Sequence, residues 1–233
     1  MADVTSQVSA SLKALTREFD IIAHNLANVS TAGYKRRCSS FSSMLEDQQN
    51  AAASALDFSQ GNLVETRRTL DVALYGKGFF VIETPDGPLY TRHGVFRANQ
   101  NGQIVDSEGR SVAGAFGPLT IPTGIDVSRV TISQTGQIHA DGASIGQFRI
   151  VDFAGKEDQL EAVGFSCYRA PQDVPARDVE DVVVKQGYQE ASNVEIIDEL
   201  VSMIMVSRMY ESNMKLVNVK KDTTNSVIGV AMG

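Results

Sequence analysis

The stretch of sequence that decides the fold is IIAHNLANVSTAGYK, residues 21–35. Its first half continues an apolar repeat that begins near the N-terminus. Its second half is a run of small and polar residues that leads to Gly33. Glycine tolerates the positive φ at which many helices stop. The pattern therefore predicts a helix over residues 1–32 that ends near Gly33 and gives way to a different structure.

The apolar repeat is typical of a helix that packs lengthwise against a partner. Its members are spaced 4, 3, 4, 3 and 4 residues apart, which is the a/d seam of a heptad repeat. An ordinary surface helix packed on its own core stays open as an alternative, because the repeat covers only about three heptads. The seam positions are Val8, Leu12, Leu15, Phe19, Ile22 and Leu26.

A second heptad repeat predicts a helix over residues 192–222. Ser192, followed three residues later by Glu195, has the pattern of a capping box at the helix start. The seam positions are Ile196, Leu200, Met203, Ser207, Tyr210, Met214 and Val217, and Ile197, Val201 and Ile204 widen the apolar face. A face this wide suits a helix with more than one neighbour. Isolated helices are marginal in water, so we expect the two ends to pack with each other and with other copies.

The middle of the chain, residues 61–189, predicts a β-rich module. Short alternating runs are bounded by turn signals. Pro85-Asp86-Gly87, Asn101-Gly102 and Thr135-Gly136 are each expected to join two strands of a hairpin. The strand candidates are residues 69–74, 78–84, 88–92, 95–98, 103–105, 130–133, 137–140, 145–153 and 160–168.

The expected fold class is α+β, with N- and C-terminal helices that form a coiled-coil-like inner domain and a central all-β module. Residues 1–33 and 190–233 are expected to form a discontinuous helical core domain, and residues 61–189 a β-rich outer domain. Residues 34–60 are polar and rich in Ser, Gln and Ala, so they are expected to form a connector.

Composition narrows the class of partner. The formal net charge of −7 argues against nucleic acid as the main partner, because phosphate binding needs a basic surface. The sequence has no apolar run of about 18 residues, so we expect no membrane span. Residues 1–7 lack the basic and apolar regions of a cleavable secretory signal, so we expect none. The two cysteines, Cys38 and Cys167, lie far apart, and we expect neither a disulfide framework nor a zinc site.

No pattern of residues indicates catalysis. None of the three histidines, His24, His93 and His139, stands in a metal-ligand spacing. The stretch Gly76-Lys77-Gly78 lacks the spacing of a phosphate-binding loop and is expected to be a turn or bulge. The acidic group Asp178, Glu180 and Asp181 is expected to be a solvated edge. We therefore expect no enzyme activity, no cofactor, no metal and no small-molecule substrate.

Residues 25–35 resemble the N-terminal signature of the bacterial flagellar rod and hook family, an Asn-Leu-Ala-Asn run followed by a Ser/Thr stretch and Gly-Tyr-Lys. Four further stretches resemble the same family in the expected order: LDVALYGKGFF (70–80), YTRHGVF (90–96), QGYQEASNV (186–194) and SRMYE (207–211). Within the family, the length resembles the rod proteins rather than the longer hook protein. The compact connector, the single β module and residues 117–122 are most similar to the proximal rod proteins, which lie next to the distal rod protein.

This resemblance implies a structural subunit of the flagellar basal-body rod, which crosses the periplasm. The subunit would be exported unfolded by the flagellar type III export apparatus and would polymerise helically into the drive shaft that transmits motor torque to hook and filament. Its partners would be other copies of itself and other axial proteins, including the proximal and distal rod proteins. The residues expected at the assembly interface are Leu12, Leu15, Phe19, Ile22, Leu26, Asn25, Asn28, Gly33, Tyr34, Ile196, Leu200, Met203, Tyr210, Met214 and Val217.

A secreted β-domain adhesin or glycan-binding module with helical flanks is the alternative hypothesis. It requires a well-formed pocket with exposed aromatic side chains in the β module. The aromatic candidates Phe79, Phe80, Tyr90 and Phe96 lie in strand runs, and we expect them in the core.

Overall fold

A computed structural model describes residues 2–38, 55–179 and 182–232 of the chain. The chain divides into two compact units. The first, called the helical unit below, comprises Met1–Asn28, Arg37–Ala55 and Val194–Gly233. The second, called the β unit, comprises Val29–Arg36 and Leu56–Asn193. Part of the expected connector, residues 39–54, lies outside the described residues.

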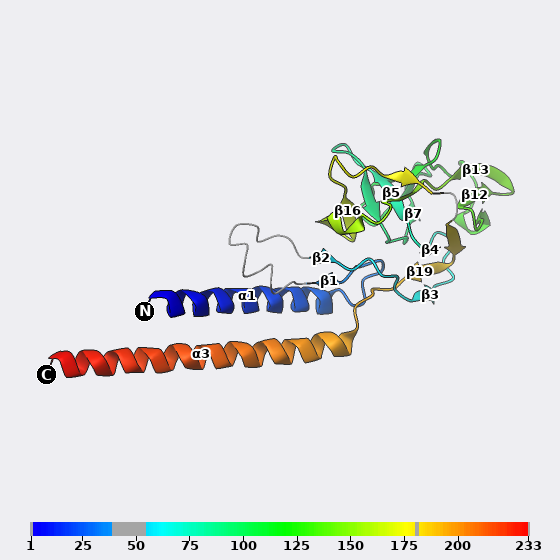
Figure 1. The fold of residues 1–233 in the computed structure, drawn as a ribbon. Helices are drawn as coiled ribbons and strands as arrows, with labels where there is room; N and C mark the ends of the chain where they lie inside the picture. Colours follow the sequence, from blue (N-terminus) through cyan, green and yellow to red (C-terminus); the bar gives the residue numbers. More distant parts are fainter. Residues whose placement is uncertain (1, 39–54, 180–181, 233) are drawn as a thin grey trace. The chain divides into compact units, whose positions relative to one another are not determined.

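The helical unit is built on two long helices, α1 (Ala2–Ala27) and α3 (Ile196–Met232). They lie side by side and run in opposite directions (Figure 1). Ser11 contacts Asn213 and Asn25 contacts Glu199, which is the pairing expected of antiparallel helices. The α+β fold class, with a helix at each end of the chain and a large central β region, is confirmed.

The end of α1 differs from the prediction. The helix ends at Ala27, so Gly33 is not the residue that terminates it. Asn28 closes the helix instead, because its backbone N–H donates to Asn25 O at 3.1 Å and its side-chain Nδ2 donates to His24 O at 2.8 Å. Gly33 lies in a later turn of the β unit.

The start of α3 also differs from the prediction, and the capping box at Ser192 is wrong. The first helical residue is Ile196, and the Glu195 carbonyl accepts the first helical hydrogen bond, from Glu199 N–H. Just before the helix, the side chain of Asn193 binds backbone on both sides. Its Oδ1 accepts from Arg36 N–H at 2.7 Å, and its Nδ2 donates to Asp57 O at 2.8 Å. These bonds keep residue 193 out of the helix.

The β unit is organised around a ten-stranded sheet with the order β15-β16-β6-β5-β9-β8-β7. Beside this path, β10 pairs with β9, and β14 pairs with β5 and β17. The strands are β5 (Phe79–Glu83), β6 (Leu89–Thr91), β7 (Arg97–Ala98), β8 (Ile104–Val105), β9 (Ser111–Gly114), β10 (Gly117–Pro118), β14 (Ile150–Asp152), β15 (Glu161–Gly164), β16 (Cys167–Arg169) and β17 (Arg177–Asp178).

Smaller sheets complete the strands. A three-stranded sheet has the order β11-β12-β13, and three two-stranded sheets pair β18 with β4, β19 with β3 and β1 with β2. Their bounds are β1 (Arg37–Cys38), β2 (Ala55–Leu56), β3 (Leu63–Glu65), β4 (Val72–Tyr75), β11 (Val130–Ile132), β12 (Gln137–Ala140), β13 (Ala143–Gln147), β18 (Val183–Gln186) and β19 (Tyr188–Glu190). Two single-turn 3₁₀ helices, Val127–Arg129 and Glu157–Gln159, lie among them.

The three predicted hairpins are confirmed. β5 pairs with β6, β7 with β8 and β11 with β12, all antiparallel. Gly87, Gly102 and Gly136 have φ values of 110°, 78° and 78°, which glycine adopts without the penalty that a side chain would carry.

Two of the predicted strands are each divided in two. Residues 145–153 contain the end of β13 and all of β14, and residues 160–168 contain β15 and the first part of β16. The second division occurs at Phe165 and Ser166, whose φ values of 49° and 54° reverse the chain. Neither position holds the Gly, Asn or Asp that usually occupies the centre of such a tight turn, so Gly164 and Ser166 give only a weak turn signal there.

The core of the β unit is aliphatic and aromatic. One buried cluster contains Phe80, Phe96 and Phe148, and a second contains Phe79, Tyr90 and Phe153. Phe79, Phe80, Tyr90 and Phe96 are all at most 7% exposed, which confirms their predicted place in the core. Within the described residues, neither helix has the length and apolar character needed to cross a membrane.

Candidate functional site

The two helices of the helical unit meet along one stripe of each. Leu15 and Ile22 from α1 and Val206 from α3 form its buried centre, with Met203 packed beside them. Polar contacts lie on either side of this centre: Asn213 Nδ2 donates to Ser11 Oγ at 3.1 Å, and Asn25 Nδ2 donates to Glu199 Oε1 at 3.2 Å. The contact is therefore apolar over a short length only.

This contact stripe is rotated from the predicted seam. On α3 it runs through Glu199, Met203, Val206 and Asn213, whereas Ile196, Leu200, Tyr210 and Met214 are exposed. On α1 it includes Leu15 and Ile22, whereas Phe19 is 40% exposed. The remaining seam positions are partly buried: Val8, Leu12, Leu26, Ser207 and Val217. Pairing of Asn25 with Glu199 selects this rotation, which a count of apolar residues alone would not predict.

A groove runs along one side of the contact stripe. It encloses a volume of about 400 Å³, and we call it the helix-pair groove. Its lining residues are Leu15, Thr16 and Phe19 from α1 and Val206, Ser207, Tyr210 and Glu211 from α3. Phe19, Ser207 and Tyr210 are members of the predicted seams. These members therefore line an open groove rather than the closed contact between the helices.

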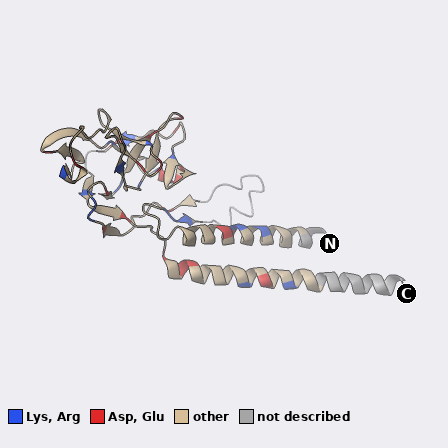
Figure 2. Cartoon of the chain, turned by 180° about the vertical axis from the view of Figure 1, so that it is seen from behind, with Lys and Arg blue, Asp and Glu red and all other residues tan. Residues whose placement is uncertain are grey.

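The rest of α3 is apolar on several sides. Among residues 196–219, whose side chains the structure describes, eleven large apolar side chains are exposed by at least 36%: Ile196, Ile197, Leu200, Val201, Ile204, Met205, Met209, Tyr210, Met214, Leu216 and Val219. Figure 2 shows only a few charged positions along the described part of this helix. A helix with apolar residues around most of its surface is usually buried on more than one side.

The two asparagines of the Asn-Leu-Ala-Asn run have structural roles. Asn25 is 1% exposed, and its amide pairs with the backbone of Arg37 in both directions: Nδ2 donates to Arg37 O at 2.8 Å, and Oδ1 accepts from Arg37 N–H at 2.9 Å. With its bond to Glu199, this side chain connects α1, β1 and α3. Asn28 closes the end of α1 through His24 O, and burial, together with the charge of Arg37, lowers the pKa of His24.

Gly33 and Tyr34 are positioned inside the β unit. The N–H of Gly33 donates to Glu190 O at 2.7 Å, and Gly33 has a φ of 64°. A Cβ on this residue would lie 2.5 Å from the backbone nitrogen of His93, so the approach of the two chain segments requires glycine. Tyr34 is 6% exposed.

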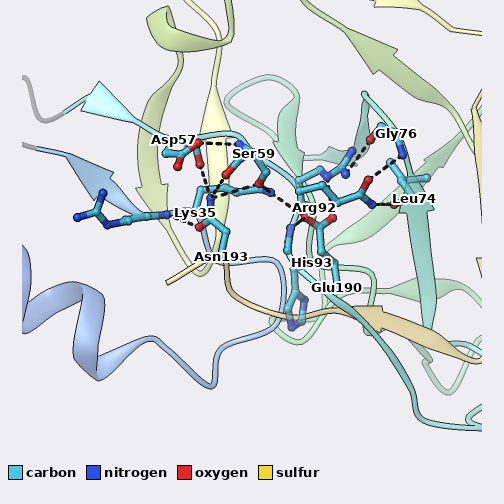
Figure 3. Close-up of polar contacts among 12 residues, drawn as sticks. Lys35, Asp57, Ser59, Leu74, Gly76, Arg92, His93, Glu190 and Asn193 are labelled. Carbon is cyan, nitrogen blue, oxygen red and sulfur yellow. Dashed lines mark hydrogen bonds and ion pairs between the residues drawn. The ribbon is translucent and has the colours of Figure 1, made fainter. Parts of the chain in front are cut away.

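A buried ion cluster lies within the β unit and consists of Lys35, Arg92 and Glu190 (Figure 3). Glu190 Oε1 accepts from Lys35 Nζ at 2.7 Å, and Glu190 Oε2 accepts from Arg92 Nε at 2.8 Å. Glu190 Oε1 also accepts from Gly61 N–H at 3.0 Å. The three charged side chains are at most 4% exposed. Burial lowers the pKa of Lys35, and the charge of Glu190 opposes that shift.

The ion cluster connects three of the family-like stretches. Lys35 ends residues 25–35, Arg92 belongs to residues 90–96, and Glu190 belongs to residues 186–194. Arg92 also donates to Gly78 O at 2.6 Å and to Gly76 O at 2.8 Å, so it holds the turn before β5. No motif or residue spacing in the sequence indicates this cluster. Its only signal was that each stretch contained one charged residue among apolar and small neighbours.

The ion cluster adjoins a cavity of about 430 Å³, whose lining includes Phe58, Lys77, Phe79, Arg92 and Asp152. Over the described ranges, no three His, Cys, Asp or Glu residues form a group that could hold a metal ion. Neither cysteine forms a disulfide, and burial raises the pKa of Cys167.

Comparisons with known proteins match the same three regions. Residues 7–35 match the family described as "Flagella basal body rod protein", residues 73–140 the "Flagellar hook protein FlgE/F/G D1 domain", and residues 185–229 the "Flagellar basal body rod FlgEFG protein C-terminal".

Similar curated proteins carry the same designation. The flagellar basal-body rod protein FlgG of Agrobacterium fabrum is 32% identical, over 94% of this chain and 95% of the relative. FlgG of Bacillus subtilis is 28% identical, over 95% and 96%. The flagellar basal-body rod protein FlgF of Rhizobium meliloti is 30% identical, over 87% of each chain. The resemblance to the rod and hook family is confirmed.

Proposed function

We propose that this chain, which belongs to the flagellar basal-body rod protein family, is a structural subunit that polymerises helically into the rod of the basal body. Its relatives are named as flagellar basal-body rod proteins. In this proposal the terminal helices form an inner tube and the β unit forms an outer layer. The rod crosses the periplasm and acts as the drive shaft that transmits motor torque to hook and filament.

The observation that carries this proposal is the uncovered surface of α3. Eleven large apolar side chains of one helix are exposed. Burying a side chain of this size is worth about 1.5–3 kcal/mol. Such a helix is stabilised when other copies cover it, and a helical assembly surrounds each subunit with copies. The proposed partners are other copies of this chain and other axial proteins, including the proximal and distal rod proteins.

Export in an unfolded state by the flagellar type III apparatus is part of the same proposal. Neither cysteine is disulfide-bonded, so the described structure contains no disulfide that would have to form before or during export. The helix pair has a buried cluster of three apolar residues, Leu15, Ile22 and Val206, and such a small core favours folding of the ends upon assembly.

Within the rod, we assign the chain to the proximal rod proteins. The support is the length of the chain, the short sequence of its connector and its single β module. Relatives named FlgG and FlgF match at similar identity, so the comparisons favour neither subgroup.

The proposed role is non-enzymatic and needs no cofactor, metal or small-molecule substrate. The relatives are named as rod proteins. Arg92, which lines the cavity of the β unit, also supports a non-enzymatic role, because its guanidinium is bound by Glu190 and by two backbone carbonyls.

Phe79, Phe80, Tyr90 and Phe96 provide no exposed binding rim for the adhesin alternative, because they are core residues. Deletion of the gene, followed by electron microscopy of isolated basal bodies, separates the two functions. We expect the deletion strain to lack the rod, hook and filament, and a plasmid copy to restore them. Normal motility with lost attachment would support the adhesin instead.

A further inference from the structure

A second apolar stripe runs along α3. Its large members are Met205, Met209 and Leu216, which are 60%, 51% and 59% exposed. Two serines belong to the same heptad spacing: Ser202 precedes Met205, and Ser212 lies between Met209 and Leu216. We call this set the methionine stripe. A heptad-spaced apolar stripe is the usual surface by which one helix packs along others.

The methionine stripe and the helix-pair groove lie on opposite flanks of α3. Successive residues of an α-helix are about 100° apart around its axis. Ser207 and Glu211, which line the groove, come one position after Val206 and Tyr210. Met205 and Met209 come one position before the same two residues. The stripe is therefore turned away from the groove of its own chain and cannot fill it.

We propose that the methionine stripe of one copy lies in the helix-pair groove of the next copy. This inference rests on the proposed function and adds the contact by which consecutive subunits would join. The two surfaces are different, so the contact is head-to-tail. A head-to-tail contact leaves one groove and one stripe free at the ends of any chain of copies, and it can repeat without closing.

The chemistry of the two surfaces matches. Phe19 and Tyr210 place two aromatic rings at the groove, and a thioether sulfur makes favourable contacts with aromatic rings. The stripe from Met205 to Leu216 is roughly 16 Å long at a rise of about 1.5 Å per residue. The exposed seam residues Leu200 and Met214 precede and follow the groove residues of α3 in the sequence, so they extend the apolar surface in both directions.

Cysteine cross-linking in isolated basal bodies tests the contact. The variant Ser207→Cys/Ser212→Cys places one thiol in the groove and one in the stripe, and it removes no apolar side chain. The two positions lie on opposite flanks of one helix, so they cannot form a disulfide within a chain. Under mild oxidation we expect loss of the monomer band and a series of dimers and larger multimers on a non-reducing gel. Each single variant should remain monomeric. The wild type is oxidised in parallel, so that any cross-link through Cys38 or Cys167 is detected.

The matched control is Lys13→Cys/Ser212→Cys. Lys13 is exposed and comes two positions before Leu15, about 200° around α1 from the contact stripe, so its thiol faces away from α3. This pair should give no multimers.

The possible results are distinguishable. Multimers in the groove–stripe pair alone support the inference. Dimers of Ser207→Cys by itself would indicate groove-to-groove pairing and overturn it. Absence of products in basal bodies that contain the variant, from cells that swim, would overturn the contact but leave the rod function intact. Absence of the wild-type chain from basal bodies would overturn both.

Discussion

At the scale of single residues, the ion cluster is the feature with the largest expected effect on stability. Replacing Glu190 with Gln leaves Lys35 and Arg92 buried beside each other without a counter-charge. We expect a loss of about 3–5 kcal/mol in the free energy of unfolding, because removing one partner of a buried ion pair leaves the charge of the other uncompensated. Urea unfolding followed by tyrosine fluorescence measures it.

The control for this prediction is Glu65→Gln. Glu65 pairs with Arg67 at 3.2 Å, but both side chains are at least half exposed, so its loss should cost at most about 1 kcal/mol. Adding Lys35→Met to Glu190→Gln should restore part of the stability. Equal losses in the two single variants would show that the cluster is not a buried charged centre.

Gly33 gives a second residue-scale prediction. A Cβ at Gly33 would meet the backbone of Arg92 and His93 at 2.5–2.7 Å, and backbone at a positive φ is strained for any other residue. Gly76→Ala is the matched control, because Gly76 also has a positive φ but its Cβ would enter open space. We expect the control to lose about 1–3 kcal/mol from strain alone and Gly33→Ala to lose more. Similar unfolding midpoints for the two variants would contradict the close approach.

The lowered pKa values of two histidines predict how the free energy of unfolding depends on pH. Burial lowers the pKa of His93 below its ordinary value of 6.5, against the opposing charges of Asp106 and Asp71, and burial also lowers the pKa of His24. Between the lowered and the ordinary pKa, the unfolded chain binds more protons than the folded chain. The free energy of unfolding should therefore fall as the pH drops through 6.5. Urea midpoints measured across this range should decline less in His93→Gln, and an equal decline would exclude His93 as a cause.

At the scale of elements, the structure separates two seam residues that the heptad pattern treats alike. Leu15 is 2% exposed within the helix pair, whereas Leu200 is 43% exposed. We expect both Leu15→Asp and Leu200→Asp to abolish rod assembly. Only Leu15→Asp should lower the helix content of the purified chain, because it removes a contact that one chain makes by itself. Circular dichroism and microscopy provide the two measurements, and Lys13→Gln, at an exposed position, is the control.

Prediction from the sequence succeeded for elements whose cause is local. The Asn101-Gly102 hairpin follows from the backbone angles that two adjacent residues permit. The helix ends were less predictable, because Asn193 bonds to Arg36 and Asp57, more than 130 residues away in the sequence. The rotation of the helix pair depends in the same way on Asn25 and Glu199, two polar residues that a search for apolar periodicity ignores.

At the scale of the whole molecule, the family-like stretches predicted the kind of protein but not what the stretches do. Lys35, Arg92 and Glu190 are widely separated in the sequence, and no spacing rule connects them. Their meeting follows only from the way the strands pair, including β19 with β3 and β5 with β6. Each of these three family-like stretches therefore contributes one charged residue to the ion cluster of the folded chain.

In a single chain, the two units should also differ in the free energy of local opening. β5 has Phe80 and Ile82 fully buried, whereas the apolar cluster that the described side chains of the helix pair form is small and consists of Leu15, Ile22 and Val206. In dilute monomer, we therefore expect the amides of residues 8–26 and 196–217 to exchange with solvent much faster than those of β5. A difference of about 2.7 kcal/mol in opening free energy corresponds to a hundredfold difference in protection. Hydrogen exchange read by mass spectrometry measures both regions in one sample, and β5 serves as the internal reference. In isolated basal bodies the helices should gain protection, because neighbouring copies cover the exposed face of α3. Strong protection of both helices in the monomer would mean that one chain stabilises them alone, and assembly would then not be what orders the ends.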